Sequence, residues 1–298
     1  MKNFLDRIQN GEVLAADGAM GSLLMAWAGD LVKGSCPEAV NLSRPEILEK
    51  IAKLYLDAGA DIIQTNTFGG SPLKLSDYKM DEKTEEINRA AVQAVRKVIG
   101  KEAYLSASVG PSGKLLKPLG PVSEDEMFDN FHRQVKVLID QEVDILCIET
   151  MTDIKEAVLA VKAVRDISKT IPVMSTMTYN PSPRGFFTIM GVTVEKAAAE
   201  AEAAGADIVG SNCGNGIENM VKIAREYRRY SKLPLIIQAN AGLPELKDDK
   251  PFYPETPEFM ASKVKDMIDA GVVIVGGCCG TTPDHIRAFR QTIDKLVS

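Results

Sequence analysis

The sequence predicts an α/β fold, a (β/α)8 or TIM barrel, in a single domain over residues 1–298. Eight short apolar runs alternate with helix-like segments, which is typical of parallel strands joined by helical crossovers. The length of 298 residues also fits, because such barrels have about 250 residues before insertions. A doubly wound sheet is the alternative. However, DGAMG follows the first strand, where that fold has a GxGxxG phosphate-binding motif.

The predicted strands are apolar runs that end in Gly, Asn, Thr or an acid. They cover residues 13–19, 60–68, 103–110, 143–150, 171–178, 206–213, 233–242 and 272–279. The predicted helices are amphipathic and cover residues 45–59, 85–100, 123–140, 153–168 and 283–297. Ser123, Asp153 and Thr282 are expected as N-caps. Four longer irregular stretches follow strands and are expected to form loops on the catalytic face: about 20–45, 110–121, 180–191 and 242–257.

Composition excludes several classes of function. The net charge of -6 and the lack of a Lys/Arg-rich run argue against nucleic acid or an anionic membrane as partner. No apolar run approaches the roughly 18 residues of a membrane span, and Asp6, Arg7 and Glu12 interrupt any signal-like core. We therefore expect a cytoplasmic protein, whose five cysteines are thiols or metal ligands.

Three of these cysteines lie at predicted strand ends. Cys213 ends the sixth strand, and Cys278 and Cys279 end the eighth. Strand ends of a barrel converge on one mouth, so three thiolates can meet around a zinc ion there. Buried structural thiols remain the alternative, because free cysteine is often buried. Asn240, at the end of the seventh strand, is either a weak fourth ligand or a polar turn residue, and the residues alone favour the turn.

A zinc ion with three thiolates suits sulfur chemistry better than water activation. A substrate thiol that binds it would ionise near neutral pH rather than near its usual pKa of about 8.5, and would stay nucleophilic. Alkyl transfer to that sulfur needs no histidine base. The two histidines, His132 and His285, are expected at the surface.

Other strand-end residues indicate an amino-acid substrate. Glu149 ends the fourth strand, where it is either an anchor for an ammonium group or a structural acid. Asp17 is a weaker case of the same kind, and the N–H groups of Gly18, Ala19 and Met20 could hold a carboxylate. Asn66 and Thr67, which end the second strand, are further predicted substrate contacts.

Several motifs together resemble the homocysteine S-methyltransferase family, and above all the homocysteine-binding barrel of cobalamin-dependent methionine synthase. They are DGAMG (17–21), CPEAVNLSRPEI (36–47), GADIIQTNTF (59–68), VGPSG (109–113), CIET (147–150), SNC (211–213), NAGLP (240–244) and GGCCGTTP (276–283). The resemblance runs from about residue 10 to 295. It implies a homocysteine-binding barrel over 1–298, zinc on the three cysteines, Asn240 as a displaceable ligand and Glu149 on the homocysteine amine.

Departures from the family concern the methyl donor. Gly69 stands where betaine-using members have a tyrosine, which disfavours betaine. The loop NPSPRGFFTIMG differs from the DxxGRTLSG pattern of full methionine synthases, and no folate or cobalamin module is present in the sequence. We expect methionine formation with a methylated corrinoid such as methylcobalamin, carried by a partner protein or module. The alternatives are a small donor such as S-methylmethionine or S-adenosylmethionine, and a non-catalytic zinc- and thiol-binding module.

Overall fold

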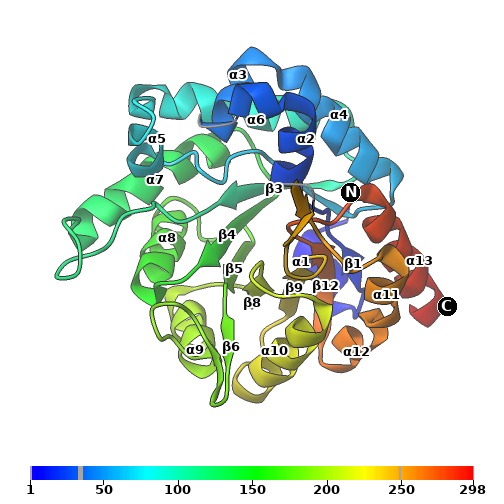
Figure 1. The fold of residues 1–298 in the computed structure, drawn as a ribbon. Helices are drawn as coiled ribbons and strands as arrows, with labels where there is room; N and C mark the ends of the chain where they lie inside the picture. Colours follow the sequence, from blue (N-terminus) through cyan, green and yellow to red (C-terminus); the bar gives the residue numbers. More distant parts are fainter. Residues whose placement is uncertain (1, 33–35, 248–249, 298) are drawn as a thin grey trace.

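The computed structural model describes residues 2–32, 36–247 and 250–297, and it confirms the (β/α)8 barrel (Figure 1). Eight parallel strands form one sheet in the order β1-β12-β9-β8-β5-β4-β3-β2. A bridge between Ala16 and Ile62 joins the first and last strands in this order, so the sheet closes. The strands are β1 (Leu14–Ala15), β2 (Ile62–Gln64), β3 (Tyr104–Val109), β4 (Ile145–Met151), β5 (Val173–Met177), β8 (Ile208–Asn212), β9 (Leu235–Ala239) and β12 (Val272–Gly277). Each lies within one of the eight predicted runs, except that β4 extends one residue beyond its run, to Met151.

A ring of helices covers the outside of the barrel (Figure 1). The main ones are α4 (Pro45–Asp57), α6 (Thr84–Ile99), α7 (Glu124–Asp140), α8 (Ile154–Ile167), α9 (Val194–Ala204), α10 (Ile217–Tyr230) and α13 (Pro283–Val297). Shorter segments are α3 (Val40–Ser43), α5 (Pro72–Ser76), α11 (Pro257–Ser262), α12 (Val264–Asp269) and the 3-10 turns Pro37–Ala39 and Asp81–Lys83. The predicted caps Ser123 and Asp153 accept hydrogen bonds from the first turns of α7 and α8. Within the described residues, no helix combines the length and hydrophobicity needed to cross a bilayer.

The strands are apolar on both faces because both are buried, as is usual in parallel sheets. One face packs against the helices in a large cluster, and the other fills the barrel interior. Four isoleucines at equivalent positions near the strand starts contribute to the interior: Ile62, Ile145, Ile208 and Ile274. The interior becomes polar toward the carboxyl ends, where Ser108, Glu149, Thr176 and Asn212 are buried. The apolar end therefore supports the fold and leaves the polar end for chemistry.

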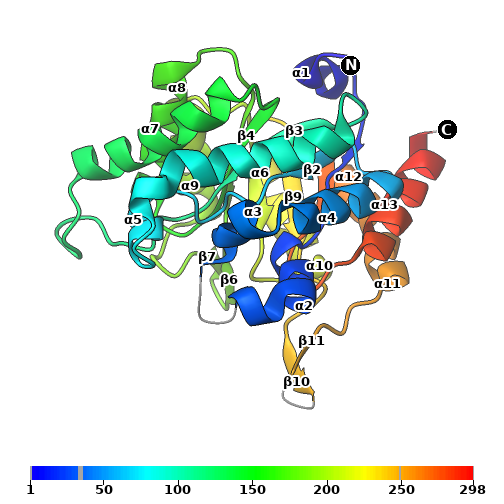
Figure 2. The same cartoon turned by 90° about the horizontal axis from the view of Figure 1, so that it is seen from above.

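The two ends of the barrel carry different structures (Figure 2). Helix α1 (Phe4–Gln9) lies at the amino-terminal end, where Phe4 and Ile8 join the interior cluster. At the opposite end lie α2 (Met20–Val32) and two antiparallel hairpins, β6–β7 and β10–β11 (Figure 2). The hairpin strands are β6 (Asn180–Ser182), β7 (Gly185–Phe187), β10 (Glu245–Lys247) and β11 (Lys250–Phe252). The mouth of the barrel is thus bordered by ordered elements.

Three details differ from the sequence prediction. The stretch 20–45 is mostly helical rather than irregular, and the stretches 180–191 and 242–257 contain the hairpins. His285 is buried rather than at the surface. Both nitrogens of its ring are hydrogen-bonded there: Nε2 donates to the Glu255 carbonyl (3.0 Å), and Nδ1 accepts from the Thr282 N–H (3.1 Å). The Thr282 hydroxyl lies 3.0 Å from the same Nδ1. It therefore contacts the His285 ring instead of accepting a backbone N–H from the first turn of α13, as the predicted cap would.

Candidate metal centre

Three cysteine sulfurs meet at the carboxyl-terminal end of the barrel. Cys213 follows β8, and Cys278 and Cys279 follow β12. The sulfur atoms all lie within 4.8 Å of one another, and those of Cys213 and Cys279 are 3.8 Å apart. A tetrahedral zinc ion with Zn–S bonds of about 2.3 Å requires sulfur atoms about 3.8 Å apart. The trio therefore has the size of a zinc-thiolate site.

The backbone places the three sulfurs through bonds to β9, the strand between β8 and β12 in the sheet. The Cys213 N–H donates to the Gln238 carbonyl (3.1 Å), and the Cys278 N–H donates to the Ala239 carbonyl (2.7 Å). Cys213 has a φ of 60°, which is uncommon for a residue with a Cβ. Such backbone strain clusters at functional sites, because surrounding contacts must hold it in place.

Glycines make room for the turn that carries two of the thiols. A Cβ at Gly277 would lie 2.2 Å from Thr281 Oγ1, and one at Gly280 would lie 2.1 Å from the Tyr253 ring. Gly280 also has a φ of 81°, which favours glycine. The sequence GGCCG therefore lets Cys278 and Cys279 bend inward below the Tyr253 ring.

The thiols influence one another electrostatically. Hydrogen bonds from Cys213 and Cys278 lower the pKa of the Cys279 thiol well below its usual value. The pKa of Cys278 rises, because hydrogen bonding to its two neighbours and burial favour its protonated form. The trio thus readily carries one thiolate, and a divalent cation would favour ionisation of the other two.

Asn240 offers a free oxygen beside this turn. Its side chain is buried, and its Oδ1 has no hydrogen-bond partner among the described residues. A buried amide oxygen without a partner costs free energy unless a ligand or an ion binds it. This favours the ligand interpretation of Asn240 over the turn interpretation, because a satisfied turn residue would have a partner for Oδ1.

Glu149 lies buried at the end of β4 and accepts two hydrogen bonds. The Ser108 hydroxyl donates to its Oε1, and Asn212 Nδ2 donates to its Oε2 (3.0 Å). Burial raises the pKa of Glu149 to about 7 despite these donors. No lysine or arginine in the described parts of the chain forms an ion pair with it, so a substrate ammonium group would find an unpaired acid there.

Asp17 is a second buried acid at the same mouth. Its Oδ2 accepts from the Gln64 N–H (2.8 Å), whereas its Oδ1 has no partner within the described chain. Burial, and then the charge of Glu149, raise the pKa of Asp17 to about 8. A bound cation such as an ammonium group would favour the ionised form of both acids, so the pair can serve as its binding site.

The predicted carboxylate-binding loop is partly occupied. The Ala19 N–H donates to Thr281 Oγ1 (3.2 Å), and the Thr281 hydroxyl donates to the Cys278 carbonyl (2.7 Å). Met20 begins α2, so the following N–H groups belong to a helix N-terminus, which favours anions. Any carboxylate site here therefore relies on Met20 and its successors more than on Ala19.

Asn66 and Thr67 are buried at the end of β2, and their side chains are engaged. Asn66 Nδ2 donates to Asn41 Oδ1 (2.7 Å), and the Thr67 hydroxyl donates to the Ser108 carbonyl (2.7 Å). A substrate contact by either residue stays a prediction, and it would use the remaining oxygen lone pairs.

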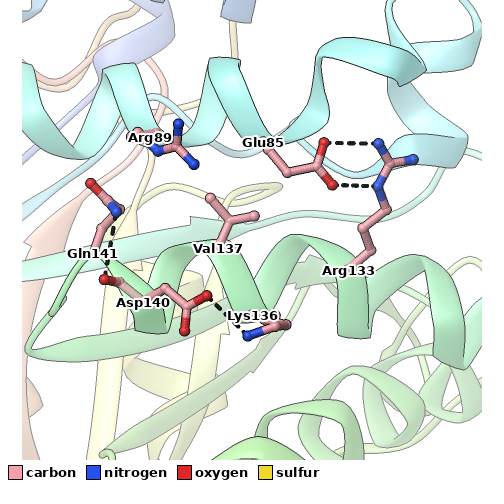
Figure 3. A pocket seen from close by; sticks show the side chains of 7 residues that line it. All are labelled: Glu85, Arg89, Arg133, Lys136, Val137, Asp140 and Gln141. Atoms are coloured by element: carbon pink, nitrogen blue, oxygen red, sulfur yellow. Dashed lines mark hydrogen bonds and ion pairs between the residues drawn. The ribbon is translucent and has the colours of Figure 1, made fainter.

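A hollow on the outer ring between α6 and α7 offers a contrast to this mouth (Figure 3). Its lining side chains are Glu85, Arg89, Arg133, Lys136, Val137, Asp140 and Gln141. Arg133 pairs with Glu85 (2.6 Å), and Lys136 pairs with Asp140 (3.0 Å). Because these charges are exposed and already paired, the hollow offers little to a ligand.

The whole barrel, and with it this mouth, falls within a known family model. The model for homocysteine S-methyltransferase matches residues 14–293. This chain belongs to the homocysteine S-methyltransferase family. That membership agrees with the resemblance expected from the sequence motifs.

Two methionine synthases are similar in sequence to this family member. The protein of Mycobacterium leprae (strain TN) is 32% identical over 298 residues, which cover 95% of this chain and 24% of the relative. The protein of Mycobacterium tuberculosis (strain ATCC 25618 / H37Rv) is 31% identical over 299 residues, which cover 95% and 25%. The chain thus spans about a quarter of the length of these relatives.

Solved structures share the fold of this family member. The homocysteine methyltransferase MmuM from Escherichia coli, in its metallated form, matches with a TM-score of 0.79 at 21% identity. The match covers 96% of this chain and 98% of that one. The carboxyl transferase domain of Rhizobium etli pyruvate carboxylase matches with a TM-score of 0.53 at 14% identity, over 96% and 48% of the two chains. At these identities the likeness shows the barrel fold alone.

The structure adds site residues that sequence reasoning missed in this family member. Ser108 and Asn212 hold Glu149, and the Tyr253 ring covers Gly280. Asn212 precedes Cys213 in the SNC motif, and its position at a strand end could have identified it as a candidate site residue. Tyr253 lies in a stretch with no such signal, because its position depends on how the β10–β11 hairpin folds back.

Proposed function

We propose that this chain transfers a methyl group to the thiol of homocysteine, giving methionine, with zinc held by Cys213, Cys278 and Cys279. The observation that carries the proposal is the three sulfurs within 4.8 Å of one another, beside the unpartnered Oδ1 of Asn240. Asn240 would complete the zinc shell in the absence of substrate. Bound zinc would lower the pKa of the substrate thiol and keep the sulfur nucleophilic.

The remaining residues would bind and orient the amino acid. Glu149 and the free Oδ1 of Asp17 would accept hydrogen bonds from the ammonium group, which neutralises two buried acids. The first N–H groups of α2, from Met20 onward, would bind the carboxylate. Recognition of both polar groups would fix the side chain so that its sulfur points to the three cysteines.

We propose a methylated corrinoid on a partner protein as the methyl donor. Support comes from the sequence identity of 32% to a methionine synthase, a relative much longer than this chain. A small sulfonium donor is the second candidate. It is favoured by the fold match that covers 98% of MmuM, a homocysteine methyltransferase of barrel size. We further propose that the chain forms one homocysteine-binding domain in the cytoplasm, where reducing conditions would keep its thiols free.

The donor is tested with the purified, zinc-loaded protein and homocysteine. Free methylcobalamin, S-methylmethionine and S-adenosylmethionine are supplied separately, and methionine is measured by mass spectrometry. We expect product with methylcobalamin and none with the two sulfonium compounds. Product with a sulfonium compound alone would support the second candidate, and homocysteine binding without turnover under every donor would support a non-catalytic thiol-binding module.

The metal is tested with Cys213→Ala. Loss of one of three thiolates should reduce bound zinc from about one ion per chain to a small fraction and abolish methionine formation, because two thiolates hold zinc far less tightly. Zinc is measured by inductively coupled plasma mass spectrometry. Cys147→Ala is the matched control, because this buried thiol lies in the barrel interior and outside the trio. Full zinc content in the Cys213 variant would overturn the proposed site.

A further inference from the structure

Asn212 lies between the proposed amine anchor, Glu149, and the proposed zinc ligand Cys213. It is the last residue of β8, directly before Cys213, and its side chain is fully buried. Its Oδ1 accepts from the Thr150 N–H (2.7 Å) and from the Thr176 hydroxyl (2.8 Å). Its Nδ2 donates to Glu149 Oε2 (3.0 Å) and to Thr150 Oγ1 (2.7 Å). Both lone pairs and both protons of the amide are thus used.

The backbone N–H of Thr150 fixes the orientation of this amide. A backbone N–H can only donate, so the atom of Asn212 that faces it must be the oxygen. The NH₂ group is then forced toward Glu149. An inverted amide would place two donors face to face at Thr150 and an oxygen against the carboxylate, with two buried groups unsatisfied.

The chain also bends sharply on both sides of this contact. Thr150, next to Glu149, has a φ of 59°, and Cys213, next to Asn212, has a φ of 60°. A positive φ is a strong outlier for the β-branched Thr150 and persists only where surrounding bonds hold it. The bond from the Thr150 N–H to Asn212 is one that does so. Asn212 therefore ties the irregular end of β4, which carries the proposed amine anchor, to the turn after β8, which carries a proposed zinc ligand.

We propose that Asn212 is a positioning residue that makes the site selective for thiols with an amino group. It holds Glu149 Oε2 at a fixed place relative to the Cys213 sulfur, so one molecule reaches both only if it carries an amine and a thiol at the spacing found in homocysteine. The inference rests on the proposed function. It goes beyond that function by assigning the selectivity to a residue that touches neither zinc nor substrate.

The test compares two thiols that differ only in the amino group. Homocysteine and 4-mercaptobutanoate, which lacks the amine, are titrated into zinc-loaded protein in a calorimeter. The wild type should bind homocysteine more tightly. In Asn212→Ala the affinity for homocysteine should fall roughly tenfold or more, the worth of a hydrogen bond to a charged group, while that for 4-mercaptobutanoate changes by less than about twofold. Equal losses for the two thiols, or no loss, would overturn the inference.

A gentler variant guards against misfolding of the alanine variant. Thr176→Val removes one hydroxyl that donates to Asn212 Oδ1 and leaves the amide in place. This variant should reduce the preference for homocysteine over 4-mercaptobutanoate about threefold, because the Asn212 amide loses one of the neutral hydrogen bonds that hold it. An unchanged preference in this variant counts against the inference.

Ser211→Ala is the matched control. Ser211 is buried in the same strand, and its hydroxyl donates to the Met177 carbonyl (2.9 Å). It should change stability without changing the preference between the two thiols, and a loss of preference equal to that of Asn212→Ala would refute a specific role. Failure of the wild type to bind either thiol would refute the proposed function and the inference together. Binding of homocysteine with an Asn212-independent preference would refute the inference alone.

Discussion

At the scale of single residues, the two buried acids at the barrel mouth should make folding depend on pH. Burial and, after it, the charge of Glu149 raise the pKa of Asp17 from 3.8 to about 8. The folded protein therefore binds a proton at Asp17 that the unfolded chain has lost above pH 4. Stability contributed by this group is complete below the unfolded pKa and is lost as the pH rises through the folded pKa.

We predict that Asp17→Asn removes this dependence. In metal-free protein, the free energy of unfolding of the wild type should fall between pH 4 and pH 8 by on the order of 3 kcal/mol more than that of the variant. Urea denaturation at a series of pH values measures the difference, in which titrations common to both proteins cancel. Parallel curves would show that Asp17 ionises normally in the fold.

The residues of the thiol chemistry could be predicted from the sequence, because the prediction needed only the position of each cysteine relative to the strands. Cys213, Cys278 and Cys279 end strands, and strand ends of a closed barrel converge. The sequence could not identify Ser108 and Asn212 as partners of Glu149, since those contacts depend on the registers of β3 with β4, of β4 with β5 and of β5 with β8. The unpartnered Oδ1 of Asn240 likewise depends on what the fold leaves around it, which no spacing reveals.

At the scale of elements, three strands begin with the same ionic arrangement. An aspartate at each start accepts the backbone N–H of the preceding strand and a guanidinium from a helix. The sets are Asp61 with Ala15 and Arg290, Asp144 with Leu105 and Arg96, and Asp207 with Val173 and Arg165. The arrangement recurs at every second strand around the barrel, so it fixes the register of β1–β2, β3–β4 and β5–β8.

The fourth position of this repeat lacks its acid. Val273, just before Ile274, stands where Asp61, Asp144 and Asp207 precede their isoleucines. Arg228 still donates to the Leu233 carbonyl, but its Nε is buried and has no partner among the described residues. Burial accordingly lowers the pKa of Arg228. The helix supplies the cation although the strand offers no carboxylate.

We predict that Val273→Asp stabilises the protein by about 1 kcal/mol, because the new carboxylate would pair with Arg228. Thermal unfolding followed by circular dichroism measures the change. Val273→Asn is the matched control, since asparagine has the shape of aspartate without its charge. This variant should be no more stable than the wild type. An aspartate variant no more stable than the asparagine variant would contradict the pairing.

Element boundaries show where the sequence was a weaker guide. The amphipathic helices were predictable because one apolar face repeats at helical spacing, as in α6 and α13. Helix α2 was missed because its sequence MGSLLMAWAGDLV has no distinct polar face. The strands of the two mouth hairpins have only three residues each, which is too short for an alternating pattern to be recognised.

At the scale of the whole molecule, support and chemistry lie at opposite ends of the barrel. Helix α1 covers the amino-terminal end, where the Phe4 ring packs edge-on against Tyr104 with centroids 5.2 Å apart. Tyr104 in turn donates from its hydroxyl to the Lys2 carbonyl (2.7 Å). Apart from Phe4 and Ile8, the interior cluster consists of residues in or directly beside the barrel strands. Changes there should alter stability and leave the mouth intact.

We predict that Phe4→Ala lowers the free energy of unfolding by about 3 kcal/mol, because it removes a buried aromatic ring and leaves a cavity. Calorimetric affinity for homocysteine in the zinc-loaded protein should stay within about twofold of the wild type, since distant sites act independently. Phe259→Ala is the control, because this phenylalanine is exposed and its loss should cost less than about 1 kcal/mol. If Phe4→Ala instead weakened homocysteine binding as much as it weakened the fold, the two ends would be coupled through the barrel interior. The interior cluster would then contribute to homocysteine binding and not only to the stability of the barrel.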